Sequence, residues 1–226
     1  MMGHYLILRL SGPMQAWGQP SFEGARLSAA FPTRSGLLGL LGACLGIRRS
    51  DRKALQELSN GVRFAIRCEQ KNIEGKAIKV TKLTDYHTVK DARESYRGLK
   101  SHETIQTWRE YLCDATFTIA VWTVESSFIS LERLTMAVKK PVFTPYLGRR
   151  SCPFSEPLYL AEVEAEKPLD ALNLCPPNEG VIYSEIANAE HDVHLQVRDE
   201  PIINLPRQFA TREWFIVQGG IGNVSK

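Results

Sequence analysis

The order of strand-like and helix-like segments constrains the fold of this chain more than any other feature of its sequence. A short apolar run over residues 5–11 precedes a helical segment over 34–45, two strand-like runs follow, and a further helical segment covers 131–139. A strand, helix, strand, strand, helix order is typical of a ferredoxin-like or RNA-recognition-type core. The sequence therefore predicts an α+β fold built on such a core.

Capping residues set the expected helix boundaries. Thr33, Ser50 and Ser130 are placed to accept hydrogen bonds from the first turn of a helix, and Gly61 stands where a helix commonly ends. The turn at 71–76 predicts that the runs before and after it form one hairpin. We expect helices over 34–45, 51–60 and 131–139 with a short one from Pro168, and strands over 5–11, 62–68, 77–83, 115–124, 158–163, 181–185, 193–198 and 214–218.

Residues 84–112 differ from the rest of the chain because no period of 2 or 3.6 residues survives there. Aperiodic segments of this length inside a compact domain are uncommon and usually functional. We therefore predict an inserted arm over 78–113 between two parts of the core, 1–77 and 114–150. A small C-terminal β-rich extension, 151–226, would pack on that core.

Composition excludes several classes of protein. Of the 226 residues, 43% are hydrophobic and 23% are charged, which are values of a globular chain rather than a disordered or collagen-like one. The longest apolar run, 36–47, is shorter than the roughly 20 residues of a bilayer span, and no cationic leader precedes the first apolar run. The five cysteines form no C-x-x-C pair, which argues against a structural zinc site. We expect a cytoplasmic protein with no metal, no cofactor and no membrane contact.

The net charge of +3 conceals a division along the chain. Residues 1–153 carry 23 Lys and Arg against 13 Asp and Glu, whereas residues 154–196 carry nine acidic residues against Lys167 alone. A basic body with an acidic flank favours a polyanionic partner on one face, and a solvated or protein-contacting surface on the other. The charge division thus points to nucleic acid.

The segment 34–45 carries glycine at positions 36, 39 and 42. Each glycine costs a helix about 1 kcal/mol, which makes sense if one face needs close approach to a sheet or to a ligand. Arg34 and Ser35 open this helix, whose free N–H groups and partial positive charge favour an anion. A helix that is simply well capped is the alternative. No Lys-Ser/Thr follows the glycines, so nucleotide hydrolysis is not expected.

Two other segments combine cations with aromatic rings, as single-stranded RNA-binding surfaces do. The loop 144–153 holds Tyr146, Arg149 and Arg150 between prolines with no acidic residue, which suits backbone phosphate. An ordinary exposed basic loop is the alternative for this segment. For the arm, the alternative is a segment that packs on a protein partner. The cations and rings of the arm are Tyr86, His87, Lys90, Arg93, Tyr96, Arg97, Lys100, His102, Trp108, Arg109 and Tyr111.

An enzyme is also conceivable. Tyr86, His87, Lys100 and His102 could form a metal-independent ribonuclease, with one group removing a 2′-hydroxyl proton and another protonating the leaving oxygen. Nothing in their spacing demands this chemistry. We therefore predict no catalytic residue and keep a repeat-specific endoribonuclease as the alternative function.

Several long stretches together resemble one known family. They are residues 5–20, which contain Ser-Gly-Pro-Met-Gln-Ala-Trp-Gly, residues 31–46, which begin Phe-Pro-Thr-Arg-Ser-Gly-Leu-Leu-Gly, and residues 96–115. Residues 144–153, 199–201 and 205–214 extend the likeness to nearly the whole chain, and it is weakest over 154–196. These stretches are similar to the type I-E branch of the fifth CRISPR-associated protein family, within the RAMP superfamily.

This resemblance implies a fold and a function. The fold would be a modified RNA-recognition core with a protruding thumb-like β arm. The function would be that of a non-catalytic subunit of Cascade, the RNA-guided surveillance complex, which binds the 5′ handle of CRISPR RNA and caps the backbone filament. Its partners would be CRISPR RNA, the backbone subunits and the large subunit, with target DNA reached through the complex. Some type I-C relatives cut the repeat with Tyr, Lys and His, but this sequence resembles the type I-E branch.

The expected contacts with the handle follow from the segments above together with the resemblance. Arginines would hold phosphates, and Trp17, Trp108 and Tyr146 would stack on bases or shape their pockets. A purely structural adaptor that touches only protein is a further alternative. The predicted RNA-binding residues are Gln15, Trp17, Arg34, Ser35, Arg93, Arg97, Lys100, Trp108, Arg109, Tyr146, Leu147, Arg149 and Arg150.

Overall fold

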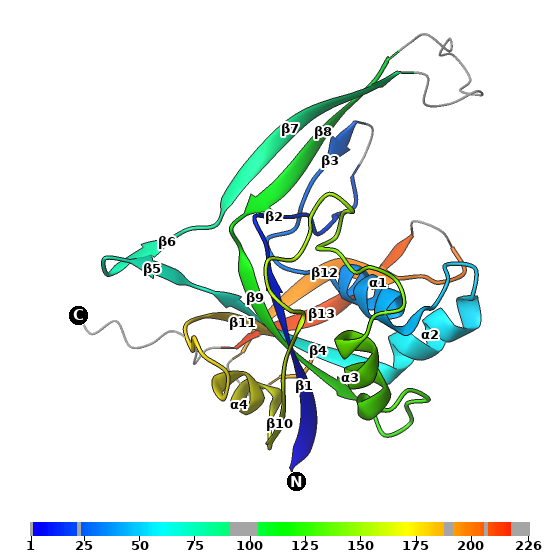
Figure 1. The fold of residues 1–226 in the computed structure, drawn as a ribbon, viewed down its shortest axis with the longest axis vertical. Coiled ribbons are helices and arrows are strands. Elements are labelled where there is room, and N and C mark those ends of the chain that lie inside the picture. The colour runs from blue at the N-terminus through cyan, green and yellow to red at the C-terminus, as the bar shows by residue number, and fades with distance from the viewer. Residues whose placement is uncertain (1, 22–23, 91–103, 188–191, 206–207, 218–226) are drawn as a thin grey trace.

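The computed structural model describes residues 2–21, 24–90, 104–187, 192–205 and 208–217 (Figure 1). The helices are α1 (Arg34–Leu45), α2 (Arg52–Gly61), α3 (Leu131–Lys139) and α4 (Pro168–Asn173). The strands are β1 (Gly3–Ser11), β2 (Met14–Gln15), β3 (Ala25–Arg26), β4 (Val62–Glu69), β5 (Lys71–Ile73), β6 (Lys76–Ile78), β7 (Thr81–Lys90), β8 (Thr104–Cys113), β9 (Thr116–Thr123), β10 (Tyr159–Ala165), β11 (Gly180–Ser184), β12 (Val193–Pro201) and β13 (Phe209–Val217).

A seven-stranded antiparallel sheet in the order β10-β1-β9-β4-β11-β13-β12 forms the body of the molecule. The four neighbouring strands β10, β1, β9 and β4 occur along the chain in the order β1, β4, β9, β10. Helices α1 and α2 lie between β1 and β4, and α3 lies between β9 and β10. The prediction of an α+β fold is confirmed.

The sheet has a hydrophobic core on each face because the side chains of a strand alternate between the two faces. Leu6, Leu8 and Leu10 of β1 are buried in one core with the apolar side chains of α1 and α3. Tyr5 and Ile7 of the same strand are buried in a second core with residues of α4. Helices therefore cover both faces of the sheet.

The helix boundaries expected from capping residues agree closely with the structure. Thr33 and Ser130 accept hydrogen bonds from the first turns of α1 and α3, and the short helix from Pro168 is present as α4. The cap of α2 is Asp51, one residue after the expected Ser50. These helices therefore begin where local side-chain chemistry predicts.

The predicted hairpin of strands 62–68 and 77–83 is wrong. Val62–Glu69 pairs with β9 and β11 inside the large sheet, and the turn after it belongs to a separate two-stranded hairpin, β5–β6. Residues from Thr81 onward pair with β8 instead. The turn was identified correctly, but the strand before it has longer-range partners.

The β7–β8 hairpin, which we call the thumb (residues 81–90 and 104–113), rises away from the body (Figure 1). Its strands pair without interruption from Thr81 with Cys113 to Lys90 with Thr104. Strand β2 pairs with β8 at the base of the thumb, and β3 pairs with β8 about halfway along it. The inserted arm expected over 78–113 is thus a β arm in its described part.

The C-terminal segment does not form a separate layer. Its first strand, β10, pairs with β1 at one edge of the large sheet, and β11, β13 and β12 extend the other edge beyond β4. Residue 150 therefore marks no structural boundary within the sheet.

Among the described residues, no helix combines the length and apolar character needed to cross a membrane.

Candidate nucleic-acid interface

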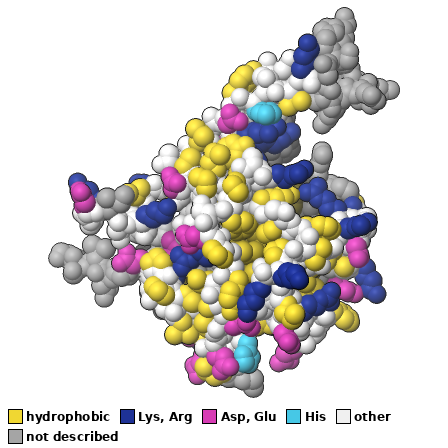
Figure 2. All heavy atoms as spheres, viewed as in Figure 1, with side chains coloured by type: hydrophobic (Ala, Val, Ile, Leu, Met, Phe, Trp, Pro, Cys, Tyr) yellow, Lys and Arg dark blue, Asp and Glu magenta, His cyan; other side chains and the backbone are white. Residues whose placement is uncertain are grey.

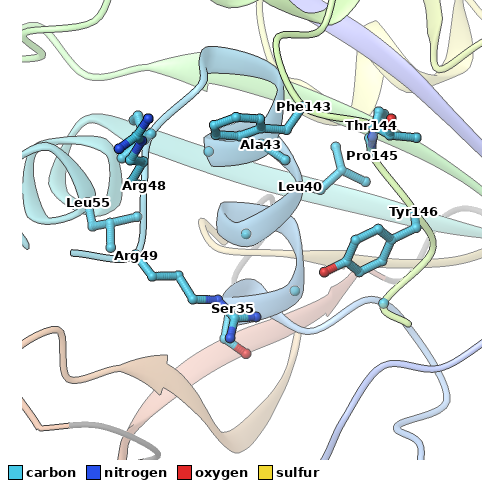
Figure 3. Close-up of a pocket in the computed structure, with 15 residues that line it drawn as sticks. Ser35, Leu40, Ala43, Arg48, Arg49, Leu55, Phe143, Thr144, Pro145 and Tyr146 are labelled. Atoms are coloured by element: carbon cyan, nitrogen blue, oxygen red, sulfur yellow. The ribbon is translucent and has the colours of Figure 1, made fainter. Parts of the chain in front are cut away.

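A groove of about 500 Å³ runs along α1 between this helix and the loop at residues 143–148 (Figure 3). Glycines 36, 39 and 42 lie on the α1 side of the groove, with Arg48 and Arg49 beyond the end of the helix. Tyr146 points toward α1 from the opposite side (Figure 3). Of the described residues that line the groove, none is acidic. A groove floor of small residues with cations at one end suits the negatively charged sugar–phosphate backbone of a nucleic acid.

The glycines of α1 have different roles. A Cβ at Gly36 would lie 2.8 Å from Cε3 of Trp17, so this glycine lets the indole pack against the helix backbone. A Cβ at Gly39 would meet nothing within 4 Å, and Gly39 is exposed. The expected close approach to the helix therefore occurs at Gly36, whereas Gly39 keeps the groove floor open.

The loop 146–150 is held in place by main-chain contacts. The amide of Ala16 donates to the carbonyl of Leu147 over 3.1 Å, and Gly148 has a φ of 84° with its α-carbon against that segment. A Cβ at Gly148 would lie 1.8 Å from the carbonyl oxygen of Ala16. Only glycine fits there, and the wall that carries Tyr146 is fixed.

Gln15, Trp17 and Leu147 are buried. Of the two roles expected of Trp17, its ring is therefore not presented for stacking on a base, and shaping a base pocket stays a prediction. The Gln15 side-chain amide donates to the carbonyls of Leu10 (3.2 Å) and Ala115 (2.7 Å), and it accepts a hydrogen bond from the Trp17 indole over 3.0 Å. These three side chains shape the interface from beneath. Their polar atoms are already used within the protein.

Arg34 does not lie at the surface as predicted. It is 4% exposed, and its guanidinium donates to Glu185 over 2.6 and 2.8 Å. Its backbone amide donates to the carboxylate of Asp199 over 2.7 Å. The end of α1 thus holds the protein's own anions, which excludes Arg34 from the phosphate-binding set. Ser35, the next residue, is half-buried and lines the groove.

Cations gather where the thumb meets the body. The guanidinium carbon of Arg149 lies 4.7 Å from the ring centre of Tyr111, and Nη2 of Arg149 donates to the carbonyl of Arg26 over 3.0 Å. Arg26 and Arg109 are register partners in the parallel β3–β8 pair, and Arg150 is exposed. Figure 2 shows Lys and Arg side chains beside the thumb base and along the side that carries α1 and α2.

Trp108 and Arg109 cannot contact the same nucleotide from one face of the thumb, because consecutive strand residues point to opposite faces. Trp108 is 47% exposed and its ring centre lies 5.5 Å from that of Tyr86, its cross-strand partner. Arg109 shares its face with Tyr111 and is held by Thr107, to whose hydroxyl its Nε donates over 3.2 Å. Trp108 and Arg109 are therefore presented on opposite faces of the thumb, and Asp85 is the register partner of Arg109.

The same alternation separates the groups of the ribonuclease alternative. Tyr86 and His87 are consecutive in β7 and lie on opposite faces of the thumb. Lys100 and His102 lie outside the described residues, as do the predicted RNA-binding residues Arg93, Arg97 and Lys100. In the described part of the thumb, no pair of expected catalytic groups converges.

The sheet face under α4, where an RNA-recognition-type core could present its central strands, is closed. Arg67 is fully buried, and its guanidinium donates to the carbonyls of Leu172 (2.7 Å) and Cys175. Arg9 donates to the carbonyl of Pro176 over 2.7 Å. Because these arginines bind the end of α4, this face offers no free cations at its centre.

The cysteines of this structure are thiols without pairing partners. Burial raises the pKa of Cys44 to about 11, and burial also raises the pKa of Cys152 and of Cys175. Buried protonated thiols are poor nucleophiles and poor metal ligands. The described residues contain no cluster of three or more His, Cys, Asp or Glu that could hold a metal ion.

Comparison with known proteins assigns the chain to a family. The family model described as CRISPR-associated protein (Cas_Cas5) matches residues 5–215. The chain belongs to the Cas5 family. The CasD subunit of the CRISPR Cascade system of Escherichia coli (strain K12) is 58% identical to this Cas5 protein over 220 residues, which cover 97% of this chain and 98% of that protein. The expected likeness to the type I-E branch is confirmed.

Solved structures agree. One, titled as a CRISPR RNA-guided surveillance complex, matches with a TM-score of 0.67 and 26% identity, over 94% of this chain and 89% of that one. Another, a crystal structure of a Cas protein, matches with a TM-score of 0.62 and 28% identity, over 96% and 97% of the two chains. The Cas5 fold therefore extends over nearly the whole chain.

Arg48 and Arg49 line the groove but are absent from the predicted set. The sequence does show a basic segment here, since residues 26–53 carry six Lys and Arg and a single acidic residue, Asp51. What the sequence could not show was that both arginines line the groove with Tyr146.

Proposed function

We propose that this chain is a non-catalytic, RNA-binding subunit of a type I-E CRISPR Cascade complex. It binds the 5′ handle of CRISPR RNA, caps the filament of backbone subunits and contacts the large subunit. Through that complex it supports RNA-guided recognition of invading DNA, in which base pairing reads the sequence and protein holds the backbone. The first four strands of the large sheet would be its ferredoxin-like core, which their β-α-β-β-α-β order supports.

The observation that carries this proposal is the groove along α1. Its volume of about 500 Å³ is in the range of pockets that enclose a small-molecule-sized group, such as one extruded nucleotide. Ser35 and Tyr146 offer hydroxyl groups, and Tyr146 offers a ring for stacking. Arg48 and Arg49 supply cations at one end.

The thumb base extends this surface. Arg109 and Arg149 are each oriented by a protein acceptor. The Nη groups of Arg109 remain for phosphate, whereas Nη1 of Arg149 is buried without a hydrogen-bond partner. Arg150 is exposed on the same loop as Tyr146. The chain would thus hold the handle between the groove and the face of the thumb that carries Arg109.

The test is to produce the chain with a CRISPR array and the other Cascade subunits, and to measure bound RNA and its 5′ ends. We expect Arg109→Ala with Arg149→Ala to reduce bound RNA and assembled complex while RNA processing in the cell is unchanged. The matched control is Arg133→Ala with Lys140→Ala, which removes the same charge from exposed positions at α3.

Salt dependence separates phosphate binding from other causes of weaker affinity. Each phosphate of single-stranded RNA that a variant no longer neutralises should reduce the slope of log affinity against log salt by about 0.7, so the Arg109–Arg149 pair should reduce it by about 1.4. The control pair should leave the slope unchanged. Accumulation of uncut precursor in the Arg109–Arg149 variant would instead support the endoribonuclease.

A further inference from the structure

Five charged side chains, of which Arg34, Glu185 and Asp199 are buried and Glu200 and Arg212 are half-buried, lie together at the N-terminal end of α1. Arg34 is joined to Glu185 with 2.6 Å between Nη1 and Oε1, and its Nε contacts the carboxylate of Glu200. Arg212 is joined to the same Glu185 over 3.0 Å and to Asp199 over 2.7 Å. The cluster therefore connects α1 with the end of β11 and with the β12–β13 hairpin.

A bulge in β12 makes this cluster possible. Residues 199 and 200 are consecutive, so in a regular strand their side chains would point to opposite faces. The register of β12 with β13 shifts between Arg198 and Glu200, which leaves Asp199 without a partner in the ladder. Bulges of this kind redirect side chains. Here the bulge brings the carboxylates of Asp199 and Glu200 to the same guanidinium, that of Arg212, while Glu200 also contacts the Arg34 guanidinium and Asp199 accepts the Arg34 amide.

Asp199 also fixes the first turn of α1. Its Oδ2 accepts the backbone N–H of Arg34 over 2.7 Å, while Thr33 Oγ1 accepts that of Gly36 over 3.3 Å. The Arg34 side chain reaches the other way and donates to the carbonyls of Ser59 and Val62, at the end of α2. The helix start is thus held from both sides.

The charges of the cluster make it a poor device for stability alone. Three carboxylates face the guanidiniums of Arg34 and Arg212, with Arg63 close by. Desolvation raises the pKa of Glu185 against the opposing effect of these three arginines. Buried ion pairs are often no more stabilising than apolar residues of the same volume, although removing one partner is costly. What such a cluster supplies is one defined geometry.

We propose that Asp199 and Arg212 are positioning residues for RNA binding. They are not among the residues that line the groove, and they act by fixing the first turn of α1, which places Ser35 and Gly36 in the groove wall opposite Tyr146. This inference rests on the proposed function. The proposal gives the β12–β13 hairpin a role in RNA binding, although neither Asp199 nor Arg212 lines the groove.

The test compares Asp199→Asn with wild type in binding a fluorescent RNA that carries the 5′ handle, well below the melting temperature of both proteins. Asparagine keeps an acceptor for the Arg34 amide but removes the charge that holds Arg212. We expect affinity to fall about three- to tenfold, within the range of coupling between contacting residues. Simple electrostatics predicts the opposite sign, because the substitution removes a negative charge. The salt slope should stay unchanged, since the same phosphates are neutralised in both proteins.

Double-mutant cycles assign the effect to the groove. Ser35→Ala should have a much smaller effect in the Asp199→Asn background, whereas Arg109→Ala should keep its full effect there. The inference is overturned if Asp199→Asn binds handle RNA as tightly as wild type. It is also overturned if the effect of Asp199→Asn on affinity simply adds to the effects of both Ser35→Ala and Arg109→Ala. If Asp199→Asn does not fold, Arg212→Lys, which keeps the charge but not the forked contact, must give the same pattern. Failure of Ser35→Ala and Arg109→Ala to weaken binding in the wild-type background would instead overturn the proposed function.

Discussion

Replacing Gly39 with alanine should stabilise the protein and leave the groove open, whereas methionine at the same position should stabilise it and fill the groove. Gly39 lies in the interior of α1, and a Cβ there would meet no heavy atom within 4 Å. Alanine is favoured over glycine inside a helix by about 1 kcal/mol, and no steric cost opposes this gain. For a chain of this length, the melting temperature should rise by about 2–4 °C.

Methionine has nearly the helix propensity of alanine, so its variant should melt no lower than wild type. Its long side chain would project into the groove, and we expect affinity for handle RNA, measured by fluorescence anisotropy, to fall at least tenfold. Gly36→Ala is the control, because its Cβ would lie 2.8 Å from the buried ring of Trp17. Overpacking of about 1–3 kcal/mol should cancel the propensity gain there.

Two results would refute this reasoning in different ways. If Gly39→Met melts above wild type and binds handle RNA equally well, then RNA does not occupy the groove. If Gly39→Ala melts below wild type, then the space above Gly39 is not open in the folded protein.

Three further predictions concern other parts of the molecule. Gly148→Ala should lower the melting temperature and weaken RNA binding together, because φ is 84° and a Cβ would lie 1.8 Å from the Ala16 oxygen. The amide of Ser28, with Lys82, lowers the pKa of Glu110, so a thermal-melt difference from Glu110→Gln should be present above pH 4.5 and vanish as pH falls through the lowered pKa. Cys44 should resist iodoacetamide at pH 8 until the protein unfolds, followed by mass spectrometry, since its pKa is about 11.

Local patterns predicted the helices well because helix ends depend on nearby side chains. The cap Thr33 and the cap Ser130 lie next to the helices that they begin. The sequence of the thumb shows no alternation of apolar and polar residues, because almost every residue of β7 is exposed and neither face of that strand is marked by apolar residues. The central strand β4 was given the wrong partner because strand pairing depends on residues far along the chain.

The candidate site was predicted in its segments more reliably than in its side chains. The loop 146–150 and the start of α1 do line or adjoin the groove. Arg34 was misassigned because its partners lie about 150 positions later in the chain, where no local pattern connects them. The stacking role was misassigned to Trp17 because a ring that packs against Gly36 has the same composition signal as a ring that stacks on a base.

The buried Arg34 has a consequence for the order in which the chain can mature during synthesis. Arg34 belongs to the first helix to leave the ribosome, but Glu185, Asp199 and Glu200 emerge more than 150 residues later. Until then the start of α1 cannot be buried without leaving an unpaired charge, which is strongly unfavourable. A chain that ends before β12 lacks Asp199 and Glu200, so it lacks the carboxylate that accepts the Arg34 amide and holds the first turn of α1.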